Sequence, residues 1–281
     1  WTGLGDDNNW SNDNNWWKLA SPVNMSPIQF AGTTRLSAFN DLAPDTTFID
    51  IKFASGSDSF QLSGNRFIIG SGGISNNSLN NQTINNDVKL STGTNIFNAN
   101  AGNMTFNGLL SGIGSVSKTG NGTVKVSVAR SIFTGSVTVS GGTLQFDNLA
   151  TNGGGDLVGP SPKVYNLNGN GVSLNLNTGS VNRIAFAGKT INFSSLGSQT
   201  VNLTGNILCN TSTFKTNGGA KNYISAPLIP GSNYFNAQFT TITYNIDDGI
   251  DDVDLEISAF MHFQCPVKTG TGKLSIVTPY G

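Results

Sequence analysis

The 281-residue chain has little charge: Asp, Glu, Lys and Arg together make up 11% of it, and the formal net charge is -1. Soluble globular proteins contain about 25% charged residues. The basic residues are scattered along the chain, which excludes the clustered positive patch of a nucleic-acid-binding protein. No apolar run approaches the ~20 residues that a helix needs to cross a bilayer, so we expect no transmembrane segment.

Histidine and cysteine are also rare. His262 is the single histidine, and Cys209 and Cys265 are the two cysteines. A zinc site needs a cluster of such ligands, so zinc binding is excluded. In an exported protein the two cysteines form a disulfide, and the alternative is a pair of buried free thiols. His262 lies among apolar neighbours, and we interpret it as a structural residue.

Helical patterns are missing too, because no window combines an apolar period of 3.6 residues with capping signals. The chain contains 35 Gly and 37 Asn instead. Both residue types tolerate the positive φ of tight corners, and Asn hydrogen-bonds to the backbone in turns. The composition therefore predicts an all-β protein in which many turns join short strands. The chain begins at Trp1 rather than Met, and we expect that an export signal has been removed.

The pattern divides the chain into three regions. Residues 1–47 hold all the tryptophans and a segment of unclear role, and we interpret this region as an N-terminal Trp-rich cap with its connection. Residues 48–220 contain short strands of period-two alternation separated by Gly, Asn and Ser. Residues 221–281 contain longer strands with aromatic residues. Apolar residues alternate with polar ones over residues 242–246 and 253–257, on the two sides of DDGIDD. We predict that these two strands form a hairpin in an antiparallel β cap or small domain.

Short alternating strands in series fit either an antiparallel sandwich or a parallel β-helix. We favour the β-helix, because its turns need only two or three short strands each, with Asn or Gly at the corners, whereas sandwich strands are usually longer. We expect about 20 to 25 residues per turn of the coil.

Residues 104–148 carry a repeat motif. Its first block comprises Phe106, Gly108, Leu110-Ser111-Gly112, Gly114, Val116, Lys118, Gly120 and Gly122-Thr123-Val124. Its second block comprises Phe133, Gly135, Val137, Val139 and Gly142-Thr143-Leu144. This stretch resembles the autotransporter-associated β-strand repeat, also called the passenger-associated transport repeat, and residues 1–17 resemble the opening of bacterial surface proteins that carry it. The resemblance implies a right-handed parallel β-helix, export, and display at the bacterial cell surface. Phe133 stands where the family usually has Tyr, and nothing resembles a translocator barrel.

Six acidic side chains gather near the predicted hairpin turn. Five aspartates within eight residues offer enough oxygen ligands for calcium, although their spacing is not that of an EF-hand loop. The alternative is a solvated acidic turn. The six residues are Asp247, Asp248, Asp251, Asp252, Asp254 and Glu256. No other cofactor is expected.

The remaining aspartates offer little for catalysis. A glycosidase or polysaccharide lyase needs paired carboxylates or a basic residue beside acidic calcium ligands. The aspartates of the predicted coil are far apart in sequence, so we identify no catalytic residue. They are Asp50, Asp58, Asp87, Asp147 and Asp156.

The tryptophans admit two readings. They plug the open end of the coil and hide its apolar core, or they form an exposed platform on which sugar rings stack. The residues concerned are Trp1, Trp10, Trp16 and Trp17.

Our leading hypothesis is a non-enzymatic extracellular structural protein that assembles with copies of itself into a surface fibre or coat. This hypothesis rests on two properties of a β-helix. The unpaired strand edges at its ends template strands of another copy, and side surfaces with little charge allow copies to pack closely. The alternatives are a monomeric adhesin that binds surface glycans, and a β-helical polysaccharide-degrading enzyme.

Overall fold

The computed structural model describes residues 1–127, 132–147, 157–158, 164–177, 184–185, 188–204, 207–208, 212–226, 234–236, 241–262 and 265–277. The chain divides into two compact units, residues 1–135 and residues 136–281. Apart from one short 3-10 helix, η1 (Asp13–Asn15), the described regular structure is β. The described residues include no helix long and apolar enough to cross a membrane.

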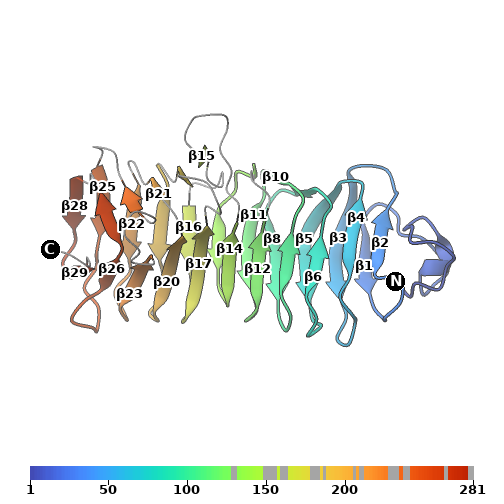
Figure 1. The fold of residues 1–281 in the computed structure, drawn as a ribbon, viewed down its shortest axis with the longest axis horizontal. Helices are drawn as coiled ribbons and strands as arrows, with labels where there is room; N and C mark the ends of the chain where they lie inside the picture. The colour runs from blue at the N-terminus through green and yellow to red at the C-terminus, as the bar shows by residue number, and fades with distance from the viewer. Residues whose placement is uncertain are drawn as a thin grey trace. The chain divides into compact units, whose positions relative to one another are not determined.

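The first unit contains two parallel sheets (Figure 1). One is formed by β1 (Ser26–Phe30), β3 (Thr46–Phe53), β5 (Phe67–Asn76), β8 (Thr94–Ala99) and β11 (Ser115–Thr119), with β7 (Val88–Leu90) and β10 (Leu110–Gly112) beside them. The other is formed by β2 (Ser37–Asn40), β4 (Gln61–Gly64), β6 (Gln82–Ile84), β9 (Met104–Phe106) and β12 (Thr123–Val126). The chain passes repeatedly from one sheet to the other, and every described strand pair is parallel, so the chain winds as a parallel β-helix, which confirms the predicted architecture in this unit.

The second unit continues this pattern with three parallel sheets. The first contains β13 (Val137–Val139), β16 (Val164–Leu167), β19 (Thr190–Phe193), β22 (Thr213–Thr216), β25 (Thr241–Asn245) and β28 (Cys265–Thr269). The second contains β14 (Thr143–Phe146), β17 (Val172–Asn177), β20 (Gln199–Thr204), β23 (Asn222–Ser225), β26 (Leu255–Ser258) and β29 (Leu274–Val277). The third contains β15 (Leu157–Val158), β18 (Ile184–Ala185), β21 (Ile207–Leu208), β24 (Tyr234–Asn236) and β27 (Phe260–His262).

The turns of the coil differ in length between the units. Asn85 and Asn107 stack one turn apart in the first unit and are 22 residues apart in sequence. Asn175 and Asn202 stack in the second unit and are 27 residues apart. Turn length varies more within the second unit, where Ile191 pairs with Phe214, 23 residues further along, and Ile224 pairs with Ile257, 33 residues further along.

Period-two alternation builds the core of both units, since successive side chains of a strand point to opposite faces. In the first unit Ile51 pairs with Ile74, and Ile74 pairs with Phe97, so buried apolar residues stack along one column. Phe97 also stacks on Phe106 across the coil, with ring centroids 4.7 Å apart. Burial of each such side chain contributes about 1.5 to 3 kcal/mol, reduced by the cost of ordering the chain.

The strand β5 branches at a glycine. Its first residues, Phe67 to Ile69, pair with β7, and its last residues, Ile74 to Asn76, pair with β8. Between them Gly73 has φ +66°, and a Cβ at this position would overlap the carbonyl group of Ile96. Only glycine combines this backbone angle with so close an approach.

The predicted C-terminal hairpin is wrong. Residues 242–246 and 253–257 form β25 and β26, which lie in different sheets instead of pairing with each other. β25 pairs in parallel with β22 and β28, and β26 pairs in parallel with β23 and β29. Alternation is the same in parallel and antiparallel strands, so it could not identify the partners. β1 and β2 lie in a segment for which the sequence pattern predicts no strands.

Candidate functional site

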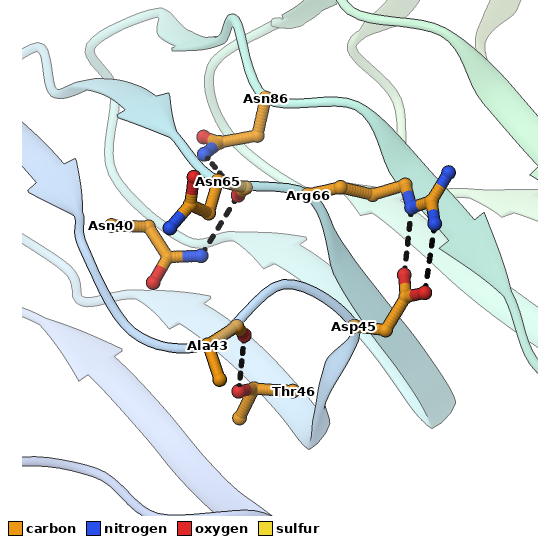
Figure 2. Close-up of polar contacts among 7 residues, drawn as sticks. All are labelled: Asn40, Ala43, Asp45, Thr46, Asn65, Arg66 and Asn86. Atoms are coloured by element: carbon orange, nitrogen blue, oxygen red, sulfur yellow. Dashed lines mark hydrogen bonds and ion pairs between the residues drawn. The ribbon is translucent and has the colours of Figure 1, made fainter.

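A polar ladder joins successive coils at one corner of the first unit (Figure 2). The backbone carbonyl of Asn65 accepts hydrogen bonds from Asn40 Nδ2 at 2.8 Å and from Asn86 Nδ2 at 3.0 Å. Asn40 and Asn86 are fully buried. Because a buried polar group is costly when it lacks a partner, these amides fix the register of three successive coils at the corner.

An ion pair lies beside the ladder. Arg66 donates from Nε to Asp45 Oδ1 and from Nη2 to Asp45 Oδ2, each at 2.7 Å. The hydrogen bond from Arg66 lowers the pKa of Asp45, and the carboxylate raises the pKa of Arg66. Arg66 and Asp45 bind each other through two hydrogen bonds, so the pair acts as a structural clamp between coils. Each group is stabilised in its charged form, which makes neither of them suited to acid–base catalysis.

Lys118 is a buried lysine that sequence reasoning missed. It pairs in register with Phe97 and faces the core of the first unit. Its Nζ donates to the carbonyls of Thr119 at 3.0 Å and Gly120 at 2.8 Å. Burial lowers its pKa to about 8. The signal was available, since Lys118 has the same alternation phase as the buried Val116.

Three of the four tryptophans are buried against the first strands of the unit, in the segment that is predicted to be a cap. Trp1, Trp10 and Trp16 are buried and pack on Phe30 with centroid distances of 5.8, 5.5 and 6.0 Å. The cap also covers a sheet edge, because the backbone of residues 8–10 forms a parallel bridge with Phe39 of β2. These three indoles are at most 7% exposed, so little of their surface is available to a ligand.

Trp17 behaves differently, with 84% of its side chain exposed. It lines a cleft of about 450 Å³ in the first unit. The other lining residues include Trp16, Lys18, Ser21, Pro22 and Gln29. The structure thus separates three buried tryptophans from one exposed tryptophan, a distinction that four tryptophans in one short sequence segment could not make.

The acidic residues of the second unit do not converge on one point, and no group of three or more potential metal ligands occurs among the described residues. Asp254 is buried and accepts from the backbone N–H groups of Gly249 and Lys273, each at 2.7 Å. Asp251 accepts from the backbone N–H of Lys221 at 2.6 Å. Asp247 donates its backbone N–H to Thr216 Oγ1, while Asp248 and Asp252 point outward. Calcium binding by Asp247, Asp248, Asp251, Asp252 and Asp254 stays a prediction.

A shallow groove of about 310 Å³ lies beside this segment. Lys221 and Tyr223 line it, and Lys221 Nζ lies 5.2 Å from the centre of the Tyr223 ring. Lys221 also binds Glu256 at 3.1 Å, and this hydrogen bond raises the pKa of the lysine. A polysaccharide lyase needs an unprotonated base to remove a proton from its substrate. Because Glu256 favours the charged form of Lys221, this lysine is unsuited to act as such a base.

The other aspartates are dispersed or engaged. Asp50 binds Lys52 at 2.9 Å, Asp58 is half-buried, and Asp87 accepts from the backbone N–H of Leu109 at 2.8 Å. Asp147 accepts from Gln145 and Asn177 at 2.8 and 3.1 Å. Asp156 and Cys209 lie outside the described residues. Only the backbone of His262 and Cys265 is described, so the disulfide stays a prediction.

The second unit presents a set of uncharged outward side chains that we call the amide face, bordered by Asp147 beside Gln145 and by the Lys221–Glu256 pair beside Tyr223. It consists of two columns of outward side chains on β14, β17, β20 and β23, in register from strand to strand. Asn202 Nδ2 donates to Asn175 Oδ1 at 2.8 Å along one column. The columns are Gln145, Asn175, Asn202 and Ser225, and Thr143, Ser173, Thr200 and Tyr223.

Comparison with known proteins yields no relative. No family model matches the chain, and searches of curated proteins and of solved structures find no match either. The resemblance of residues 104–148 to the autotransporter-associated repeat stays a prediction.

Proposed function

We propose that this protein is a non-enzymatic structural protein of the bacterial cell exterior, whose copies pack side by side in a surface fibre or coat. The observation that carries this proposal is the amide face of the second unit. Its outward side chains are small or neutral, and they repeat at the spacing of the strands. When two such faces approach each other, charge repulsion is confined to their borders, where Asp147 lies beside Gln145.

The side chains of the amide face are ordered before a second copy binds, and this favours contact between copies. Asn175 and Asn202 are already hydrogen-bonded to each other, so little side-chain entropy is lost when a second copy binds. Stacked amides of this kind stabilise the sheet–sheet contacts of cross-β assemblies.

The size of the face favours an array over an isolated dimer. Four strands about 4.8 Å apart and two columns about 7 Å apart cover only a few hundred Å². A stable pairwise interface buries about 800 Å² per partner. Each contact is therefore weak, and association depends on many contacts being made together.

The cap favours side-by-side packing over head-to-tail stacking. Trp10 donates its backbone N–H to the Phe39 carbonyl, and Phe39 donates to Asn8, at 2.9 and 2.8 Å. These bonds occupy backbone groups of β2 that would otherwise template a further strand.

Sedimentation velocity and electron microscopy of the 281-residue chain test this proposal. We expect larger species to grow with concentration, and ordered sheets or bundles in images. Asn202→Lys places a charge at the centre of the amide face and is expected to abolish assembly. The chain already has Lys215 at an outward strand position, so the substitution is compatible with the fold.

Asn121→Lys is the matched control, because Asn121 is exposed on a turn of the first unit and belongs to neither column of the amide face. It should assemble like the wild type. A uniform monomer at all concentrations, or full assembly of Asn202→Lys, would contradict the proposal.

Export would also permit the disulfide between Cys209 and Cys265. Alkylation of the denatured protein with and without reductant, followed by mass spectrometry, tests it. Two thiols labelled without reductant would exclude the bond.

A further inference from the structure

The cleft beside Trp17 is a second feature of the first unit that packing does not explain. Trp17 is the most exposed aromatic side chain among the described residues, whereas the neighbouring Trp16 is buried. An exposed indole combines a large apolar face with an N–H donor, and tryptophan is enriched at binding surfaces for this reason. We propose that this cleft binds a neutral glycan through a flat, all-equatorial hexopyranose ring, independently of the proposed assembly.

The segment that carries Trp17 is held in place. Trp16 Nε1 donates to the carbonyl of Trp10 at 2.7 Å, and Leu19 donates its backbone N–H to the Trp16 carbonyl at 2.9 Å. Asp13 accepts from the backbone N–H of Ser21 at 2.7 Å. The indole of Trp17 therefore stands on a backbone fixed on both sides, and a ligand that binds it loses little free energy to ordering the loop.

The chemistry of the cleft fits a sugar. An all-equatorial hexopyranose presents a flat face of C–H groups, which stacks on an indole ring, while its hydroxyl groups point outward around the rim. Ser21, Gln29 and Lys18 supply hydroxyl, amide and ammonium groups near the ring. The lining includes no carboxylate and a single lysine, which favours a neutral ligand over a strongly charged one.

A proline-rich peptide is the competing occupant, since such peptides dock between aromatic rings. Recognition of a peptide backbone uses N–H and O–H donors that reach its carbonyls. Trp16 Nε1 is already committed to Trp10, and Trp1 Nε1 is buried. The buried indoles therefore offer no donor to a peptide carbonyl, and titration with a proline-rich peptide distinguishes this occupant from a sugar.

Acrylamide quenching of tryptophan fluorescence tests the proposal, because Trp17 is the exposed indole. The neutral probes are cellohexaose and chitohexaose, and decaproline and hexagalacturonate represent a proline-rich peptide and a charged glycan. Each is titrated to about 10 mM, so that a Kd of this order is detected. We expect one neutral hexasaccharide to protect Trp17 from quenching with a saturable curve. Trp17→Ala should weaken its binding at least tenfold in calorimetry, and Trp17→Tyr should restore most of it.

Leu79→Ala is the matched control, because Leu79 is an exposed apolar residue of the same unit that does not line the cleft. It should bind like the wild type. No saturable binding of either neutral hexasaccharide, tighter binding of decaproline or hexagalacturonate, or full binding by Trp17→Ala would each overturn the proposal. Protection that grows with protein concentration alone would assign the cleft to a second copy of the chain. Asn202→Lys should bind the hexasaccharide normally, so failure of the assembly proposal is distinguishable from failure of this one.

Discussion

Arg66 binds Asp45 of the preceding coil through two parallel hydrogen bonds, each 2.7 Å long. This geometry is specific to the guanidinium group, since lysine offers a point charge without a fork. The pair therefore fixes the distance and angle between two coils at the corner shown in Figure 2.

Asp45→Asn tests this clamp. Arg66 lowers the pKa of Asp45, so the pair stabilises the fold above the unfolded carboxyl pKa of about 3.9, and this contribution is lost as the pH falls through the lower folded value. Both side chains are partly exposed, so we expect the variant to lower the thermal midpoint by only a few degrees at pH 7. The difference from wild type should shrink as the pH falls below the unfolded pKa, and it should also shrink in ~1 M salt. A difference that depends on neither pH nor salt would show that the charge is not responsible.

The buried amides should matter more than the ion pair. Asn86→Ala removes one donor to the Asn65 carbonyl and leaves a void, and we expect a loss of about 1 to 3 kcal/mol in the free energy of unfolding. Asn121→Ala, on an exposed turn, should change it by less than about 0.5 kcal/mol. Urea unfolding followed by tryptophan fluorescence measures both, because all four tryptophans lie in the first unit. Equal losses in the two variants would refute the role of the ladder.

Because Lys118 is buried, we expect the free energy of unfolding to rise with pH above pH 8. Its folded pKa of about 8 is below the unfolded value, so between these values the unfolded chain binds more protons and stability increases with pH. We expect a gain of about 1 to 2 kcal/mol between pH 8 and pH 9.5. Measurements should stop there, since burial raises the pKa of Tyr165 and ionisation of this tyrosine in the unfolded chain then opposes folding.

Lys118→Met should remove that rise, and the outward Lys125→Met should keep it. The free energy of unfolding at several pH values, from urea titrations, decides between them. A slope that survives in Lys118→Met would assign the effect to another group.

Much of the fold follows from the alternation of side chains. Buried residues such as Val124 and Val126, or Leu174 and Leu176, lie where the period-two pattern places them. The pattern could not identify strand partners, because alternation specifies which side of a strand is buried and not which strand lies beside it. The hairpin over residues 242–257 was wrong for this reason.

The candidate sites were less predictable than the fold. Trp16 and Trp17 are adjacent in sequence, yet one is buried and the other exposed. Their separation depends on the turn after η1, which no periodicity encodes. Lys118 was overlooked because lysine is rarely buried, although its alternation phase with Val116 indicated an inward position.

Gly73→Ala is expected to be among the most damaging substitutions in the first unit. The position has φ +66°, and the new Cβ would overlap the backbone of Ile96 on the next coil. Backbone strain alone costs about 1 kcal/mol, and the overlap forces β5 and β8 apart, so we expect a loss above about 3 kcal/mol. Gly93 separates the two effects, because its φ is +88° and a Cβ there would meet nothing within 4 Å. Gly93→Ala should therefore cost only the strain of about 1 kcal/mol. Urea unfolding of the two variants measures the difference, and equal losses would show that close packing between β5 and β8 does not require glycine.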